Sequence, residues 1–223
     1  MILPPNTAQE LLHRAQQLAG LTLQELAQQL NIEVPHDFSR DKGWGGILLE
    51  RALGATAGSR PEPDFPALGI EMKTLPISSI GQPLETTFVC VAPMKGMTGE
   101  HWETSALRHK LDHVLWVPIL AEKHLSPAER QIGSAFLWRA SAEQELALRQ
   151  DWEELMELLS LGRVERINAH LGQFMQLRPK AANGSVKTDA IGANGELVQA
   201  QPKGFYLRTS FTQWVLRQQF APE

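Results

Sequence analysis

The chain has 223 residues, of which 43% are apolar, and a formal net charge of −4. This composition can bury a substantial core in one large domain or two lobes, and the acidic total charge gives no global signature of a nucleic-acid-binding protein. We expect no membrane span, secretory signal, disulfide framework or cysteine metal cluster, because long apolar runs are missing and Cys90 is the sole cysteine. The expected location is cytoplasmic.

Two short helices are expected at the start of the chain. Residues 7–10 and 22–25 each match a capping box, and leucines at helical spacing follow both. The apolar stripe of the second helix consists of Leu23, Leu26, Ala27 and Leu30. A helix-turn-helix DNA reader is one interpretation, but the polar face carries glutamines rather than basic residues, so we favour a packing role.

A glycine-rich loop over 41–46 leads into a helix expected over 47–53, which ends at Gly54. Lys42 beside three glycines suits close approach to a phosphate. A loop anchored by a buried Trp44 explains the pattern equally well. Glu50 on the helix is a candidate metal ligand, although a lone helical glutamate is more often an exposed charge.

The most informative pattern is Asp64 followed by Glu71 and Lys73. Glu71 and Lys73 alternate with two apolar residues, so in a strand they share one face while the apolar pair points into a core. A proline and a glycine mark a turn just before them. We therefore expect a hairpin over 64–75, in which a preceding strand ends near Asp64 and brings its carboxylate beside Glu71.

This pattern suits phosphodiester chemistry. Two neighbouring carboxylates supply the hard oxygen ligands that Mg²⁺ prefers, and Mn²⁺ or Ca²⁺ can replace it in vitro. Lys73 is expected one strand repeat away, roughly 6–7 Å, where a cation meets the developing charge of a phosphodiester or the attacking water. A solvated strand face with Asp64 capping a turn is the competing interpretation, because so short a pattern is common by chance.

The middle of the chain predicts a mixed α/β domain. We expect a strand over 86–92, a helix over 105–110 and a strand over 114–119, a succession that differs from a helical bundle or a sandwich. Arg108 and Lys110 are candidates for phosphate contacts. His109 and His113 are four residues apart, but a helix end expected between them argues against a histidine metal site.

The last part of the chain combines an acidic helix with basic strands. A long helix is expected over 141–159, and its acidic outer surface is attributed to solvation. Strands over 174–180 and 204–208, an exposed mobile loop over 183–195 and a closing helix near 211–216 follow. Residues 160–223 carry 8 lysines and arginines against 4 aspartates and glutamates, a local charge of +4. This quarter is the expected surface for a polyanion.

The motif resembles a known nuclease core. Asp64, Glu71 and Lys73, preceded by a helix with Glu50, are similar to the core shared by type II restriction endonucleases and related DNA repair enzymes. Over essentially the whole chain the sequence resembles the MutH family, through residues 40–44 (RDKGW), 48–50 (LLE), 57–59 (AGS), 68–74 (LGIEMKT), 84–92 (LETTFVCVA), 102–105 (WETS), 178–183 (RPKAAN) and 203–206 (KGFY).

The resemblance implies a fold and an activity. The fold is one restriction-endonuclease-like domain over 1–223, with a mixed central sheet flanked by helices. A DNA-binding cleft is expected between an N-terminal lobe, whose catalytic hairpin region covers 40–92, and a basic C-terminal lobe over 160–223. MutH-family enzymes nick the unmethylated strand at hemimethylated GATC sites in mismatch repair, use Mg²⁺, act as monomers, and are activated by MutL, with MutS upstream.

The resemblance also implies residue roles. Asp64 and Glu71 bind the metal with assistance from Glu50, and Lys73 either orients or deprotonates the attacking water or stabilises transition-state charge. The family's segments for site recognition correspond to Arg178, Lys180, Lys203 and Tyr206. Together with the phosphate candidates, the expected set that contacts double-stranded DNA is Lys42, Arg108, Lys110, Arg178, Lys180, Lys203, Tyr206 and Arg208.

Arg178 is the candidate base reader, because an arginine can donate two hydrogen bonds to guanine and discriminate by roughly 1–3 kcal/mol, whereas lysines mainly contact phosphates. Tyr206 either rejects N6-methyladenine by steric conflict or packs against Phe205 and the closing helix.

Two other functions are open. The chain could be a restriction-like endonuclease that cuts both strands as a dimer, but one set of active-site residues per chain favours a monomeric nickase. It could also be a non-catalytic DNA-binding module of the same fold, and the intact triad argues against that.

Overall fold

The computed structural model describes residues 2–38, 43–58, 60–168, 170–181 and 183–220. The chain forms two compact units, Met1–Glu85 with Asp112–Arg139, and Thr86–Leu111 with Ala140–Glu223. This division differs from the expected lobes. Residues 86–92, expected beside the catalytic hairpin, belong to the second unit, because the strand they form pairs there.

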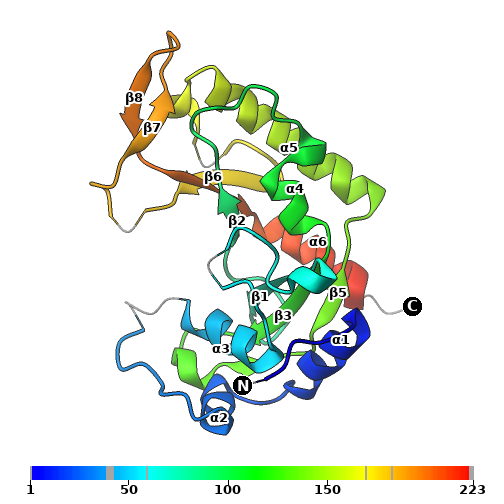
Figure 1. Ribbon diagram of the computed structural model, residues 1–223. Coiled ribbons are helices and arrows are strands. Elements are labelled where there is room, and N and C mark those ends of the chain that lie inside the picture. Colours follow the sequence, from blue (N-terminus) through cyan, green and yellow to red (C-terminus); the bar gives the residue numbers. More distant parts are fainter. Residues whose placement is uncertain (1, 39–42, 59, 169, 182, 221–223) are drawn as a thin grey trace. The chain divides into compact units, whose positions relative to one another are not determined.

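The first unit packs helices on a mixed sheet (Figure 1). Its strand β1 (Glu71–Ile77) pairs in parallel with β3 (Val114–Leu120), and β3 pairs antiparallel with β4 (Gln131–Ile132) and β5 (Phe136–Trp138). Its α-helices are α1 (Ala8–Gln17), α2 (Leu23–Gln29) and α3 (Trp44–Leu53). Buried side chains of all three helices share a core with Ile70 and Met72. The helices therefore cover one face of β1, which leaves Glu71 and Lys73 on the other.

The N-terminal helices begin and end largely as expected. The Thr22 side chain and Glu25 form a capping box at the start of α2, and the Thr7 hydroxyl caps α1. Helix α3 begins at Trp44, earlier than expected, so the predicted loop over 41–46 is shorter. It ends at Gly54 with φ +78°, where a Cβ would lie 2.6 Å from the carbonyl oxygen of Leu3.

The hairpin expected over 64–75 is wrong. Pro66 begins a short 3-10 helix, η1 (Pro66–Leu68), that ends at Gly69 with φ +63°. A single antiparallel bridge joins Phe65 to Ile70 in place of a preceding strand. The residues between Phe65 and Ile70 form this turn, so no strand precedes β1 there, and β1 pairs with β3 instead.

The second unit is built on an antiparallel sheet in the order β2-β9-β6. Its strands are β2 (Thr87–Val91), β9 (Lys203–Leu207) and β6 (Met175–Pro179), and its helices are α4 (Ala106–Leu111), α5 (Ala142–Ser160) and α6 (Thr209–Phe220). Helix α4 contacts β2, and α5 contacts β6. The predicted mixed α/β class is thus confirmed across the described residues.

The mobile loop expected over 183–195 is wrong for residues 188–191, which form a strand. Strands β7 (Thr188–Ile191) and β8 (Leu197–Ala200) form an antiparallel hairpin (Figure 1). Asn194 and Gly195, with φ +83° at the glycine, lie in its turn. An Asn-Gly pair is a strong hairpin signal, which the loop interpretation overlooked because the flanking residues are small and polar.

Candidate active site

Asp64 is held against the first residues of β1 by a backbone hydrogen bond. Its Oδ2 atom accepts the N–H of Met72 at 2.8 Å. Its carbonyl oxygen accepts the N–H of Thr56 at 3.1 Å, which fixes the other side of the turn. The chain leaves Asp64, passes through η1 and returns to the residue between Glu71 and Lys73, so all three functional side chains belong to one short segment.

Glu71 and Lys73 form an ion pair at the start of β1. Lys73 Nζ lies 2.7 Å from Glu71 Oε1, and the two side chains are only 12% and 5% exposed. Burial of charge costs free energy unless the charges are paired. The interpretation as a solvated strand face is therefore wrong, because both side chains are largely removed from water and bonded to each other.

The donor set fits a hard divalent cation. Asp64, which accepts the Met72 N–H, and Glu71, the residue before Met72, both offer carboxylate oxygens. Mg²⁺ commonly uses one or two protein carboxylates, with water and phosphate oxygens completing its shell. Glu50 is half-buried on α3. Among the described residues no group of three or more His, Cys, Asp or Glu side chains is close enough to hold a metal ion. The Asp64 and Glu71 carboxylates have the chemistry that such a cation prefers, and their role and that of Glu50 as a third ligand stay predictions.

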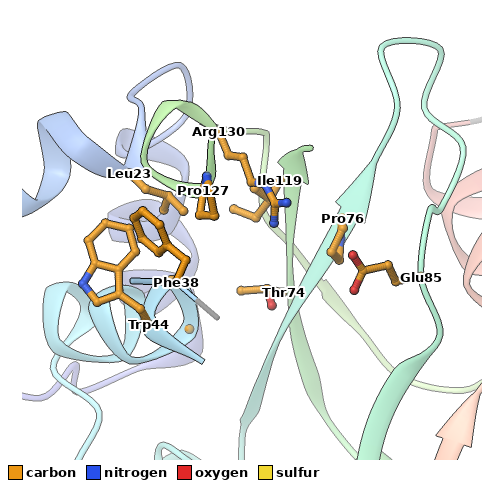
Figure 2. Close-up of a pocket in the computed structure, with 11 residues that line it drawn as sticks. Leu23, Phe38, Trp44, Thr74, Pro76, Glu85, Ile119, Pro127 and Arg130 are labelled. Atoms are coloured by element: carbon orange, nitrogen blue, oxygen red, sulfur yellow. The ribbon is translucent and has the colours of Figure 1, made fainter. Parts of the chain in front are cut away.

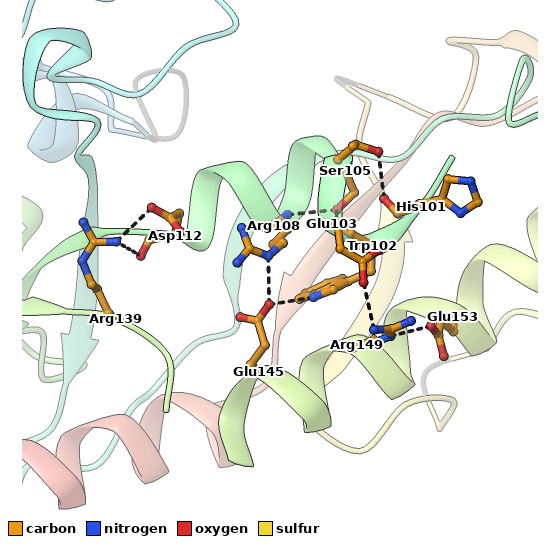
Figure 3. Close-up of polar contacts among 11 residues, drawn as sticks. His101, Trp102, Glu103, Ser105, Arg108, Asp112, Arg139, Glu145, Arg149 and Glu153 are labelled. Atoms are coloured by element: carbon orange, nitrogen blue, oxygen red, sulfur yellow. Dashed lines mark hydrogen bonds and ion pairs between the residues drawn. The ribbon is translucent and has the colours of Figure 1, made fainter. Parts of the chain in front are cut away.

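An arginine-centred cluster, formed by residues just before β3 and just after β5, contacts the start of β1. The N–H of Glu71 donates to the carbonyl oxygen of His113 at 3.0 Å. Arg139 donates to the Asp112 carboxylate at 2.9 Å and to its carbonyl oxygen at 3.2 Å (Figure 3). Arg139 also lies 3.1 Å from His113 Nδ1. Arg139 thus holds the Asp112–His113 segment, whose His113 carbonyl oxygen accepts the Glu71 N–H.

His113 belongs to this brace rather than to a histidine pair. Burial, reinforced by the charge of Arg139, lowers the pKa of the His113 imidazole. Helix α4 ends at Leu111, so His109 and His113 do not share a helix face. The sequence offered no signal for Arg139, because it is 27 residues from Asp112 along the chain.

Four side chains form a cluster on the sheet of the second unit, which we call the cation–aromatic face: Phe88, Arg178, Lys180 and Tyr206. The Arg178 guanidinium lies 5.3 Å from the centre of the Tyr206 ring, and Lys180 Nζ lies 4.2 Å from that of Phe88. The two rings are 5.3 Å apart. Arg178 also donates to the Thr86 hydroxyl at 2.8 Å.

The contacts of Tyr206 on the cation–aromatic face bear on the packing interpretation of this residue; its role against methylated adenine stays a prediction. Its ring is half-buried against Phe88 and Arg178, whereas Phe205 is buried and alternates with it along β9. Packing of Tyr206 against Phe205 and the closing helix is therefore wrong. Phe88 was not assigned a role from the sequence, because only its register opposite Tyr206 brings it to this face.

The chain is similar in sequence to known DNA mismatch repair proteins over nearly its whole length. The family described as "DNA mismatch repair enzyme MutH" matches residues 53–151. The "DNA mismatch repair protein MutH" of Escherichia coli O9:H4 (strain HS) is 53% identical over 220 residues, which cover 99% of this chain and 96% of that protein. The proteins of the same description from E. coli O139:H28 and Shigella boydii serotype 18 share the same identity and coverage. The chain belongs to the MutH family.

Membership of the MutH family confirms the resemblance inferred from the motifs. The chain is a DNA mismatch repair endonuclease with the mixed α/β fold expected of that family. The matched region 53–151 includes Asp64, Glu71 and Lys73. No helix among the described residues has the length and apolar character needed to cross a membrane.

The remaining DNA-contact candidates of this MutH-family chain are dispersed. Lys203 lies on the opposite face of β9 from Tyr206 and lines a cavity beside the β7–β8 hairpin. Burial there lowers the pKa of its ammonium. Arg208 donates to the carbonyl oxygen of Leu171 at 2.8 Å. Arg108 donates to Glu145 at 2.9 Å (Figure 3). These DNA contacts stay predictions.

Two further candidates for DNA contact are lysines. Lys110 is half-buried at the end of α4, and Lys42 lies outside the described residues. Both are held as predictions.

The acidic outer face of α5 does more than interact with water. Glu145 accepts hydrogen bonds from Arg108 and from the Trp102 indole N–H, the latter at 2.8 Å (Figure 3). Asp151, on the same helix, is buried. The prediction that the acidic residues of this helix serve only to interact with water is therefore wrong for Glu145 and Asp151.

A cavity of about 390 Å³ in the first unit lies apart from the Asp64 and Glu71 carboxylates, neither of which lines it. Its lining includes Trp44, Thr74, Pro76 and Arg130 (Figure 2). Thr74 and Pro76 alternate with Lys73 along β1, so they face the opposite side of the strand. The candidate active site of this MutH-family chain thus lies outside this cavity, on the other face of β1.

Proposed function

We propose that this chain is a Mg²⁺-dependent endonuclease that nicks the unmethylated strand at hemimethylated GATC sites in methyl-directed mismatch repair. In this proposal it acts in the cytoplasm as a monomer on double-stranded DNA and is activated by MutL, with MutS upstream. The observation that carries the proposal is the hydrogen bond from Met72 to Asp64, which holds one carboxylate beside the buried pair of Glu71 and Lys73.

The proposed roles follow from the chemistry of these three side chains. Asp64 and Glu71 would hold the cation, and Glu50 would assist. When bound, Mg²⁺ polarises a phosphoryl oxygen and activates water. Lys73 donates from a buried position to Glu71, so its ammonium is oriented before substrate arrives. Preoriented donors contribute most where charge develops in the transition state. This arrangement favours electrostatic stabilisation over proton abstraction as the role of Lys73.

Site recognition is assigned to the cation–aromatic face. Arg178 is fixed by Thr86 and lies over Tyr206, so a base reader and a methyl sensor are neighbours. Arginine can donate two hydrogen bonds to guanine O6 and N7. Methylation of adenine N6 adds bulk and removes a donor in the major groove, and the rigid Tyr206 ring is suited to exclude it.

One experiment tests the whole proposal. A duplex with one GATC site is prepared in unmethylated, hemimethylated and fully methylated forms, each strand is labelled separately, and cleavage is followed with Mg²⁺ and with or without MutL. We expect cuts only in unmethylated strands and acceleration by MutL. Cleavage of the methylated strand, or equal rates at a scrambled site, would contradict the proposal.

A restriction-like enzyme that cuts both strands is the second candidate. A circular plasmid with a single GATC site separates the two: a nickase accumulates open circles, whereas a dimeric restriction enzyme produces linear DNA at once. A non-catalytic binding module would retain DNA without any strand break.

A further inference from the structure

Asp151 is a buried carboxylate with an unusual set of partners. It lies on α5 with 6% of its surface exposed. Its Oδ1 atom accepts the N–H of Gln173 at 2.8 Å. Its Oδ2 atom accepts the N–H of Phe174 at 2.6 Å and that of Met175 at 2.8 Å. Three consecutive backbone N–H groups therefore converge on one side chain, in the way that backbone nests bind anions.

The turn before β6 is shaped around this carboxylate. Gly172 has φ +75°, and a Cβ there would lie 2.1 Å from the carbonyl oxygen of Met175 and 3.4 Å from Asp151 Cγ. Only glycine fits this conformation and this space. Without the carboxylate, three backbone donors lose their acceptor at once, and the penalty is largest for the buried N–H of Met175.

The strand that starts at this turn carries the proposed base reader. Strand β6 begins at Met175, and its register places Gln176 opposite Tyr206 and Arg178 opposite Gly204. Arg178 is three residues beyond the last N–H held by Asp151, a rise of roughly 10 Å. Because side chains alternate along a strand, a slip of one residue would turn Arg178 away from Tyr206.

We propose that Asp151 is a positioning residue for DNA recognition. It anchors the start of β6 and so aligns Arg178 and Lys180 with Phe88 and Tyr206 on the cation–aromatic face. Its burial on α5 keeps it from touching DNA itself. The inference rests on the proposed GATC-specific function.

The test compares Asp151→Asn with Glu154→Gln, which makes the same charge change at an exposed position of the same helix. The full-length protein is assayed with Mg²⁺ on a GATC duplex and on duplexes with one substituted base pair. For Asp151→Asn we expect KM for GATC to rise on the order of tenfold, with a similar loss of discrimination, comparable to a lost base contact. The kcat at saturating DNA should change less than threefold, and Glu154→Gln should match wild type.

The outcomes separate positioning from a purely structural role. If Asp151→Asn melts at a lower temperature but keeps the wild-type KM and discrimination below its melting transition, the inference is wrong. If that variant does not fold, Asp151→Glu keeps the charge with a displaced carboxylate and must show the reduced discrimination. Unchanged discrimination in folded Asp151→Glu then overturns the inference. Wild type without GATC preference would instead contradict the proposed function.

Discussion

Asp64 accepts the backbone N–H of Met72, the residue that separates Glu71 from Lys73. This hydrogen bond links the turn to the strand, because the donor Met72 belongs to β1 and the acceptor Asp64 lies before the turn. The Met72 side chain is buried in the core, so its backbone is anchored there. The position of the Asp64 carboxylate therefore depends on the packing of the opposite face of the sheet.

Replacement of Asp64 by asparagine should abolish nicking while DNA binding persists. Loss of one hard ligand weakens cation binding, and the amide cannot replace the carboxylate charge. We expect kcat to fall on the order of a hundredfold or more, measured by strand-resolved cleavage, with the Kd for DNA in Ca²⁺ within about threefold of wild type. Glu33→Gln serves as the control, because Glu33 is 87% exposed. Nicking by Asp64→Asn at the wild-type rate would remove Asp64 from the active site.

Lys73→Met should reduce stability as well as activity. It removes the ammonium that pairs with the buried Glu71 carboxylate, and loss of one member of a buried ion pair typically costs about 3–5 kcal/mol. Urea unfolding measures the change. The double variant Glu71→Gln with Lys73→Met should recover part of the stability and none of the nicking. The Glu71→Gln single variant completes the cycle: if the free-energy changes of the two single variants add up to that of the double variant, the pair is not energetically coupled.

Arg139→Ala should lower kcat with little effect on KM. The substitution removes the brace on the turn whose His113 carbonyl receives the Glu71 N–H, and a small displacement of a catalytic group can cost on the order of tenfold or more. Steady-state nicking over a range of DNA concentrations separates the two constants. Arg149→Ala is the matched control, because Arg149 also pairs with exposed carboxylates (Figure 3). Equal effects of the two substitutions would argue against a specific role for Arg139.

Arg178→Ala and Lys180→Ala should weaken DNA binding in different ways. Loss of a base reader relaxes discrimination at one base pair by roughly 1–3 kcal/mol. Loss of a phosphate contact lowers affinity for all sequences and reduces the salt slope by about 1. Binding isotherms on GATC and substituted duplexes at several salt concentrations distinguish these results. Identical losses on every duplex for both variants would mean that Arg178 does not read a base.

The helix cap at Glu25 should make part of the stability depend on pH. Hydrogen bonds from the Thr22 backbone and hydroxyl lower the pKa of Glu25 below 4.5. Because the folded pKa is depressed, the cap stabilises the protein above the unfolded pKa and loses that effect as pH falls through the folded pKa. The melting temperature of Glu25→Gln should therefore lie below wild type at pH 7 and approach it in acid. A difference that is constant with pH would exclude the ionised cap.

Local patterns in the sequence were sufficient for the elements that depend on neighbouring residues. Capping boxes predicted α1 and α2, and alternation predicted the buried Met72 beneath Glu71 and Lys73. The prediction for residues 64–75 was wrong because the strand partner of β1 lies far away in the sequence. The turn at 64–75 was expected to be a hairpin, yet β1 pairs with β3, more than forty residues away along the chain, as the register of Glu71 with Val114 shows.

The sequence by itself determined the helices, the mixed α/β class and the Asp64, Glu71 and Lys73 motif, because capping, periodicity and motif spacing are written within about ten residues. Only the tertiary structure decided which side chains meet across long separations. Thr86 and Arg178 are 92 residues apart, and Asp151 and Gln173 are 22 apart. Such contacts depend on strand register and helix docking, which are set by the packing of the whole unit and which no short window of sequence contains.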